Sequence, residues 1–146
     1  MLYLADCFRL SGTVLSEYSL RDENSLRRHS PGFAVLASYS VELYIKCLLA
    51  IEGRQLPTSH DIKFLFGQLP RETREGLRKK HDEHPDRPGD LDEMLEKGGD
   101  TFNKVRYLFE RHKTEFGLNW LGEVIRQRII SLHPDWEADD ATFPPQ

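Results

Sequence analysis

The sequence predicts an all-α protein that folds as a helical bundle. Apolar residues repeat at intervals of three and four along most of the chain, and no clear segment alternates with a period of two. The length of 146 residues suits one compact domain. With 38% hydrophobic and 30% charged residues, the composition is typical of a soluble globular protein and argues against a disordered or membrane-embedded chain.

We expect one domain over residues 1–133, followed by an acidic, flexible tail over residues 134–146. The formal net charge is −4, and no lysine or arginine follows His133. Four acidic residues do lie in this tail: Asp135, Glu137, Asp139 and Asp140. Residues 1–133 therefore hold equal numbers of acidic and basic side chains, so the overall charge does not argue against an anionic partner.

A first helix is predicted from Leu2 to about Tyr18, and the polar residues 19–30 are predicted to form a loop. The central helix is the clearest element. Ser30 suits its N-cap, Pro31 its first turn and Gly53 its C-terminal end. Because apolar residues lie on opposite sides of this helix, we expect it to be buried nearly all round.

The later part of the chain predicts five more helices. Thr58 and Asp61 have capping-box spacing, which indicates a short helix over residues 62–69. A charged and largely exposed helix follows at 71–82, and residues 84–89 form a loop. Asp90 and Asp100 suit the N-caps of helices at 91–97 and 101–113. The last helix covers residues 118–132, where Pro134 prevents its continuation.

Cysteine usage and the apolar segments favour a cytoplasmic protein that does not cross a membrane. Cys7 and Cys47 cannot form a disulfide framework or a thiolate metal site by themselves. The longest apolar region, residues 33–51, is interrupted by Glu42 and Lys46. These two residues stand one helical turn apart with the acid first, so we expect a partly buried pair that binds each other or a third group.

The charged helix at 71–82 offers a weak candidate surface for nucleic acid. Three arginines lie on one face and a lysine follows them, so these side chains could follow phosphates: Arg71, Arg74, Arg78 and Lys79. Because Glu72 and Glu75 are interleaved with them, an ordinary solvated helix explains the pattern as well. Both interpretations stay open from the sequence.

Three strings in order give the chain a family resemblance. SVELYIKCLLAIEG lies in the central helix, HDIKFLF opens the short helix, and FNKVRYLFERH lies in the 101–113 helix. Together they resemble a HEPN domain over roughly residues 30–133. The resemblance implies an up-and-down core of four main helices with short extra helices, a homodimer, and binding of RNA or a nucleotide. It also implies a place in a toxin–antitoxin or defence system, with a nucleotidyltransferase-like antitoxin as partner.

Arg106 and His112 match the motif that active members of this family use for metal-independent RNA cleavage. The resemblance implies that His112 would transfer a proton and Arg106 would stabilise charge on the phosphate, with no metal or cofactor. Six residues turn a helix by about 600°, so the two side chains point about 120° apart. A second subunit across a dimer seam would bring both to one phosphate.

Other features of the same string favour binding with weak or absent cleavage. Tyr107 stands where active members usually have a small polar residue, and the string is more similar to a branch with Arg-Tyr followed by an acid. Arg106 then pairs with Glu110 or Glu42, and His112 is either a histidine of the core or a partner of the helix dipole at the C-terminal end. His60 serves either a nucleotide pocket or a structural hydrogen bond. A purely structural domain for protein interaction is the remaining alternative.

Overall fold

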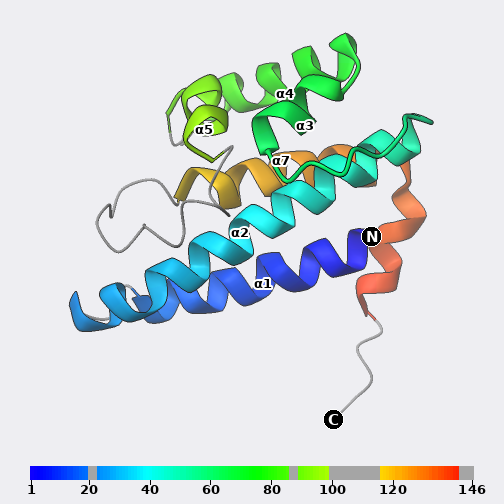
Figure 1. The fold of residues 1–146 in the computed structure, drawn as a ribbon. Coiled ribbons are helices and arrows are strands. Elements are labelled where there is room, and N and C mark those ends of the chain that lie inside the picture. The colour runs from blue at the N-terminus through cyan, green and yellow to red at the C-terminus, as the bar shows by residue number, and fades with distance from the viewer. Residues whose placement is uncertain (20–22, 86–88, 99–115, 142–146) are drawn as a thin grey trace.

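The computed structural model describes residues 1–19, 23–85, 89–98 and 116–141 (Figure 1). Their elements are α1 (Leu2–Ser19), α2 (Glu23–Ile51), α3 (Ile62–Gln68), α4 (Arg71–Glu83), α5 (Leu91–Gly98), α7 (Phe116–Leu132) and the 3₁₀ helix η2 (Pro134–Ala141). This part of the chain contains helices and loops and no strand. The predicted all-α helical bundle is therefore confirmed.

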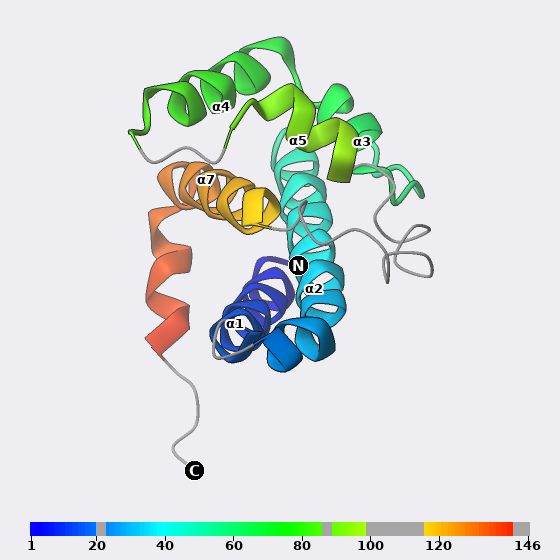
Figure 2. The same ribbon diagram turned by 90° about the vertical axis from the view of Figure 1, so that its left-hand side faces the viewer.

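The helices form a bundle of three long helices with a layer of shorter helices on one side. Figure 1 shows α1 and α2 side by side as an antiparallel hairpin, with α7 packed along α2. In the view of Figure 2, α3, α4 and α5 lie together over the end of the bundle formed by α2 and α7. The central position predicted for the α2 segment is confirmed, whereas the helix predicted at 101–113 lies outside the described residues.

Helix α2 is buried on more than one side along its C-terminal half. Tyr44, Ile45, Leu48 and Leu49 are all 0% exposed, although they do not share one stripe of the helix. The neighbouring α1 and α7 cover Tyr44, while α3 packs on another side. A helix that is apolar nearly all round forms the centre of the core, as its pattern predicts.

The start of α2 differs from the prediction. Residues 23–30 are helical and continue directly through Pro31, and Ser19 belongs to α1, so the loop expected over residues 19–30 is wrong at these positions and Ser30 is not the N-cap. The polarity of this segment pointed to a loop, but its residues are compatible with a helix, and the hairpin partner α1 lies alongside. Tertiary packing commonly stabilises helices that their own sequence leaves marginal.

Capping contacts define the C-terminal end of α2 and the N-terminal end of α3. Gly53 has φ of +64°, and the next amide, of Arg54, donates to the carbonyl of Leu49 over 2.8 Å, which ends α2 as predicted. At α3 the N-cap is Asp61 and not Thr58, because the Asp61 carboxylate accepts a hydrogen bond from the amide of Phe64 over 3.0 Å. The expected capping box is therefore wrong by three residues.

Helix α4 and the C-terminal segment are more closely packed than their composition suggests. Thr73, Leu77 and His81 recur every four residues on α4 and form a buried face, although the rest of the helix is mostly exposed. In the predicted tail, residues Pro134–Ala141 form η2, and Trp136 stacks on His133 with 4.3 Å between ring centroids. Trp136 packs against the core.

Two glycines lie where helices approach closely. A Cβ atom built on Gly12 of α1 would lie 3.5 Å from the ring of Phe33 on α2. On Gly122 of α7 it would lie 3.4 Å from the ring of Tyr44. Both glycines are buried. Because they have no side chain, the aromatic rings of α2 can pack directly against the backbone of α1 and of α7.

By length and composition alone, one described segment is apolar enough to cross a membrane. It is Gly32–Ile51, with a mean hydropathy of 1.6. Within the bundle, 61% of this window is buried, and core helices of soluble proteins meet the same criterion. The finding is weak evidence for a membrane span.

Candidate functional site

The first cluster of functional side chains lies on the C-terminal half of α2. Glu42 is only 7% exposed, and its carboxylate accepts a hydrogen bond from the Lys46 ammonium over 2.7 Å. The two residues stand one turn apart, with the acid nearer the N-terminus, which is the favourable orientation for a helical ion pair. The predicted partly buried pair is present.

A third group, His60, completes this cluster from a distant part of the sequence. After α2 ends at Ile51, the chain returns along the helix before α3 begins (Figure 1). His60 Nδ1 lies 3.1 Å from each carboxylate oxygen of Glu42. The hydrogen bond predicted for His60 therefore goes to Glu42, and His60 lies directly before Asp61, the N-cap of α3.

The cluster combines a buried carboxylate with an accessible imidazole. The Glu42 side chain is 9% exposed and the Lys46 side chain 15%, whereas the His60 side chain is 60% exposed. A carboxylate at Nδ1 fixes the orientation of an imidazole ring and favours the proton on that nitrogen. The arrangement can present an oriented histidine to a ligand or to a proton transfer, with Lys46 adding positive charge beside it.

The residues expected to carry RNA cleavage lie outside the described part of the chain. They are Arg106, Tyr107, Glu110 and His112. Pairing of Arg106 with Glu42 or Glu110, and the position of His112, therefore stay predictions. Of the supporting residues, Glu42, Lys46 and His60 are brought together.

The basic run on α4 is largely engaged with acidic neighbours. Arg71 contacts Glu75 over 2.7 Å, and Lys79 lies 3.7 Å from Glu83. Arg74 differs, because its Nε atom is buried without a hydrogen-bond partner. Paired cations lose part of their attraction for phosphate, so the arrangement favours the solvated-helix interpretation over a nucleic-acid surface.

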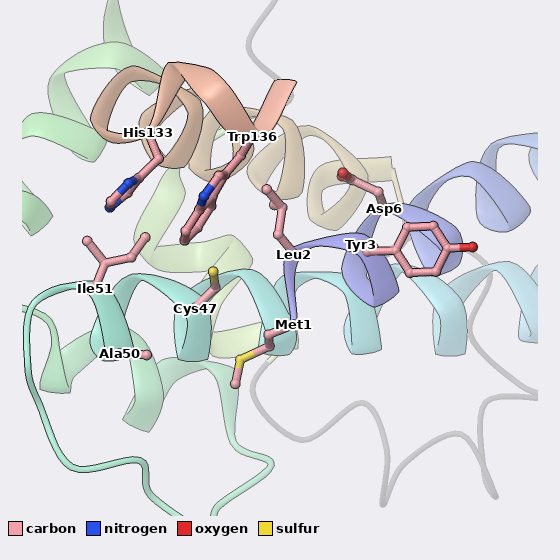
Figure 3. Close-up of a pocket in the computed structure, with 9 residues that line it drawn as sticks. All are labelled: Met1, Leu2, Tyr3, Asp6, Cys47, Ala50, Ile51, His133 and Trp136. Atoms are coloured by element: carbon pink, nitrogen blue, oxygen red, sulfur yellow. The ribbon is translucent and has the colours of Figure 1, made fainter. Parts of the chain in front are cut away.

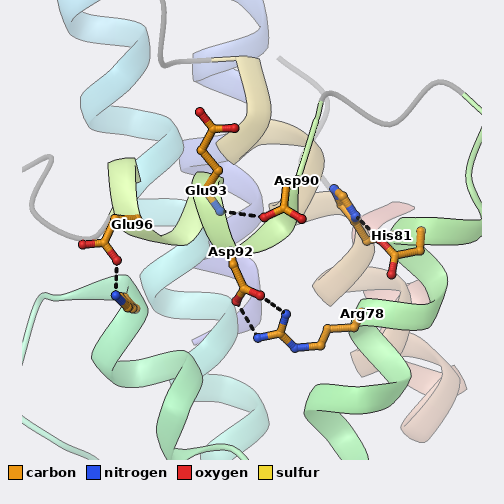
Figure 4. A network of polar contacts seen from close by, with 8 residues as sticks. Arg78, His81, Asp90, Asp92, Glu93 and Glu96 are labelled. Atoms are coloured by element: carbon orange, nitrogen blue, oxygen red, sulfur yellow. Dashed lines mark hydrogen bonds and ion pairs between the residues drawn. The ribbon is translucent and has the colours of Figure 1, made fainter.

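Arg78 forms the strongest ion pair of this run (Figure 4). Its guanidinium makes two hydrogen bonds to the Asp92 carboxylate, over 2.7 and 2.6 Å, and so ties α4 to α5. The bidentate contact lowers the pKa of Asp92, chiefly through the hydrogen bond from Arg78, and raises the pKa of Arg78. Asp90 begins α5, as predicted, by accepting a hydrogen bond from the amide of Glu93.

Sequence reasoning missed a second polar cluster, which is buried between α1, α2 and α7. Asp6 of α1 is 4% exposed, and its Oδ1 atom accepts hydrogen bonds from the Tyr44 hydroxyl and from Arg126 Nε, the latter over 2.8 Å. Arg9 donates to the Tyr44 hydroxyl over 3.2 Å and contacts Glu123 over 3.3 Å. Burial and the neighbouring Asp6 carboxylate raise the pKa of Tyr44, which keeps its hydroxyl protonated.

A sequence signal for this cluster did exist. Asp6 follows Ala5, which is fully buried, and lies one turn after Leu2 on the inward side of α1. A charged residue on the inward face of a helix requires a partner of opposite charge. The signal identifies Asp6 as paired, but it does not identify Arg126, which is 120 residues away in the chain.

Comparison of the chain with models of protein families, with curated proteins and with solved structures finds no match. The HEPN resemblance therefore stays a prediction. Among residues 1–19, 23–85, 89–98 and 116–141, no group of three histidine, cysteine or acidic side chains is placed to hold a metal ion.

Proposed function

We propose that this protein is a HEPN-like cytoplasmic module that binds RNA or a nucleotide, with weak or absent cleavage. One observation carries the proposal. The contact between Glu42 and His60 joins two of the three strings on which the resemblance rests, the one in α2 and the one that opens α3. The cluster also offers an exposed imidazole beside an ammonium group, which suits a phosphate or a ribose hydroxyl.

The alternative within the same family is a metal-independent endoribonuclease that uses Arg106 and His112 across a dimer seam. In that case the RNA 2′-hydroxyl is the nucleophile, and the products have cyclic phosphate ends. A toxin–antitoxin or defence role, with a nucleotidyltransferase-like antitoxin, belongs to this proposal as well. The two candidates differ in whether bound RNA is cut.

A binding experiment tests the proposed function. Fluorescently labelled single-stranded RNA and labelled ATP are titrated with the full chain, and anisotropy is followed as the salt concentration is raised. We expect His60→Ala to weaken binding of one of these probes by about tenfold, since it removes the exposed polar group of the cluster. Gln55→Ala, an exposed change in the same loop, is the matched control and should leave binding unchanged. Equal binding by both variants contradicts the role of the cluster.

Cleavage is measured separately, with RNA in the presence of EDTA. We expect little or no product from the unmodified chain. EDTA-resistant cleavage that Arg106→Ala and His112→Ala both abolish, with the thermal midpoint unchanged, establishes the endoribonuclease instead. If the two residues are structural, the same variants lower the free energy of unfolding by about 1–3 kcal/mol and no cleavage is lost.

A specific observation favours a second candidate, in which the domain functions through protein contacts. Tyr3, Leu10 and Val14 of α1 are 64%, 47% and 51% exposed, and together with Cys7 they follow the spacing of four, three and four that helices use to pair. This apolar stripe suits the homodimer that the resemblance implies. Light scattering should give twice the monomer mass for the unmodified chain, and Leu10→Glu should reduce it to the monomer mass.

A further inference from the structure

A pocket whose lining does not include Glu42, Lys46 or His60 is independent of the proposed function. It lies where the start of α1, the C-terminal turns of α2 and η2 meet (Figure 3). Its volume is about 620 Å³, within the range of pockets that hold small molecules. The lining is mostly apolar and includes Met1, Leu2, Cys47, Ile51 and Trp136.

One wall of the pocket is aromatic. The rings of His133 and Trp136 are stacked nearly parallel, with an interplanar angle of 11°. Figure 3 shows the Trp136 ring reaching from η2 toward Cys47 on α2. Burial raises the pKa of the Cys47 thiol, so this group adds a neutral, polarisable surface to the pocket. An aromatic or aliphatic body fits such a wall better than a strongly hydrated one.

The polar feature of the lining that sets the ligand chemistry is the carboxylate of Asp6, which is 4% exposed. Within the described part of the chain, the contacts of Asp6 with Tyr44 and Arg126 both use its Oδ1 atom. Its Oδ2 atom is then the carboxylate oxygen that can accept a hydrogen bond from a ligand. An ionised carboxylate oxygen only accepts hydrogen bonds, so Asp6 selects a ligand that donates one over an anion that cannot.

We propose that this pocket binds a small, largely apolar molecule that ends in a hydrogen-bond donor, with the donor directed at Asp6 and the apolar body against Trp136. The lining combines apolar side chains with a few polar groups, Tyr3, His133 and the acidic Asp6, and such a combination is typical of specific small-molecule sites. Burial of the apolar body drives binding, and the Asp6 hydrogen bond provides the selectivity.

Three probes with the same apolar body test the proposal: phenylbutylamine, phenylbutanol and phenylbutyrate. Each is titrated into the full chain and followed in two-dimensional proton–nitrogen NMR spectra. We expect the amine and the alcohol to shift the Trp136 indole and Ile51 amide signals saturably. Phenylbutyrate should bind at least about tenfold more weakly, because its ionised carboxylate has no hydrogen to donate to Asp6. Equal affinity for all three probes overturns the proposal.

Two variants locate the binding site. Ala50 is exposed and lines the pocket, so Ala50→Trp should fill it and weaken the amine at least about tenfold without disturbing the core. Gln68→Trp places the same side chain at an exposed position of α3 and should leave binding unchanged. Binding that survives Ala50→Trp overturns the proposal. The proposal is also overturned if the NMR signals of Trp136 and Ile51 shift with protein concentration when no probe is present, because a second copy of the chain then covers the pocket.

Asp6→Asn tests the selectivity directly. The preference for the amine over phenylbutyrate should shrink, since the asparagine amide can donate a hydrogen bond to the anionic probe. Asp6 also holds Tyr44 and Arg126, so this variant is first checked for a folded spectrum. If it does not fold, the probe series and Ala50→Trp still decide the proposal.

Discussion

Helix α2 carries two polar clusters on opposite sides, and they differ in what surrounds them. Glu42 and Tyr44 are two residues apart, which places them about 200° apart around the helix. The Tyr44 cluster is closed by α1 and α7, and its carboxylate, Asp6, is 4% exposed. The Glu42 cluster ends in His60, whose side chain is 60% exposed. Similar chemistry therefore holds helices together on both sides, but the group it presents to a ligand differs: a carboxylate in the pocket lining on one side and an exposed imidazole on the other.

The largest expected effect lies in the buried cluster. Asp6→Ala should lower the free energy of unfolding by about 3–5 kcal/mol, because it leaves the Arg126 guanidinium and the Tyr44 hydroxyl without their acceptor inside the bundle. Asp92→Ala is the matched control, since it also removes a carboxylate from an arginine, but that carboxylate is 66% exposed. It should cost no more than about 1 kcal/mol. Chemical denaturation of both variants measures the difference, and equal costs would contradict the role of burial.

An intermediate effect is expected in the Glu42 cluster. Glu42→Ala should lower the free energy of unfolding by about 1–3 kcal/mol, because it leaves the poorly exposed Lys46 ammonium unpaired. His60→Ala should cost less than about 1 kcal/mol, since the ring is mostly in solvent. A double-mutant cycle with Lys46→Met isolates the ion pair and should give a coupling of about 1 kcal/mol. If His60→Ala lowers the free energy of unfolding more than Glu42→Ala does, the stabilising role assigned to Glu42 is contradicted.

The smallest effect concerns pH and the exposed pair of α4 and α5. Arg78 lowers the pKa of Asp92 from its ordinary value of 3.8, so Asp92 binds a proton less readily in the folded chain than in the unfolded one. The stabilisation is therefore complete above pH 3.8 and is lost as the pH falls through the lowered folded value. Because the pair is largely exposed, the effect stays below about 1 kcal/mol. The difference in unfolding free energy between the unmodified chain and Asp92→Asn should vanish on acidification, and a difference that grows contradicts this assignment.

Much of the fold follows from patterns that extend over a single helix. The apolar residues on both sides of α2 and the stop at Gly53 are local features, and both predictions are confirmed. The same local reasoning failed where tertiary contacts decide the outcome. The sequence of residues 23–30 predicts a loop, but these residues are helical with α1 beside them. The composition of α4 predicts an exposed helix, but its face of Thr73, Leu77 and His81 is buried.

The candidate site shows the same limit. The spacing of Glu42 and Lys46 on one helix predicted a pair with room for a third group, and this pair is present. That the third group is His60 depends on the path of the loop after α2, which no local pattern encodes. Asp6 and Arg126 are farther apart still, and only the packing of α1 against α7 brings them together.

The close approach at Gly122 restricts how this sequence can vary. Alanine at this position would place its Cβ in ordinary contact with the Tyr44 ring, whereas a larger side chain would push the ring away from Asp6. A smaller residue at position 44 could relieve the crowding but would lose the hydroxyl that Asp6 and Arg9 bind. In homologues of this chain, a tyrosine at position 44 is therefore expected to occur with glycine or alanine at position 122, and a larger residue at 122 with a changed residue at 44.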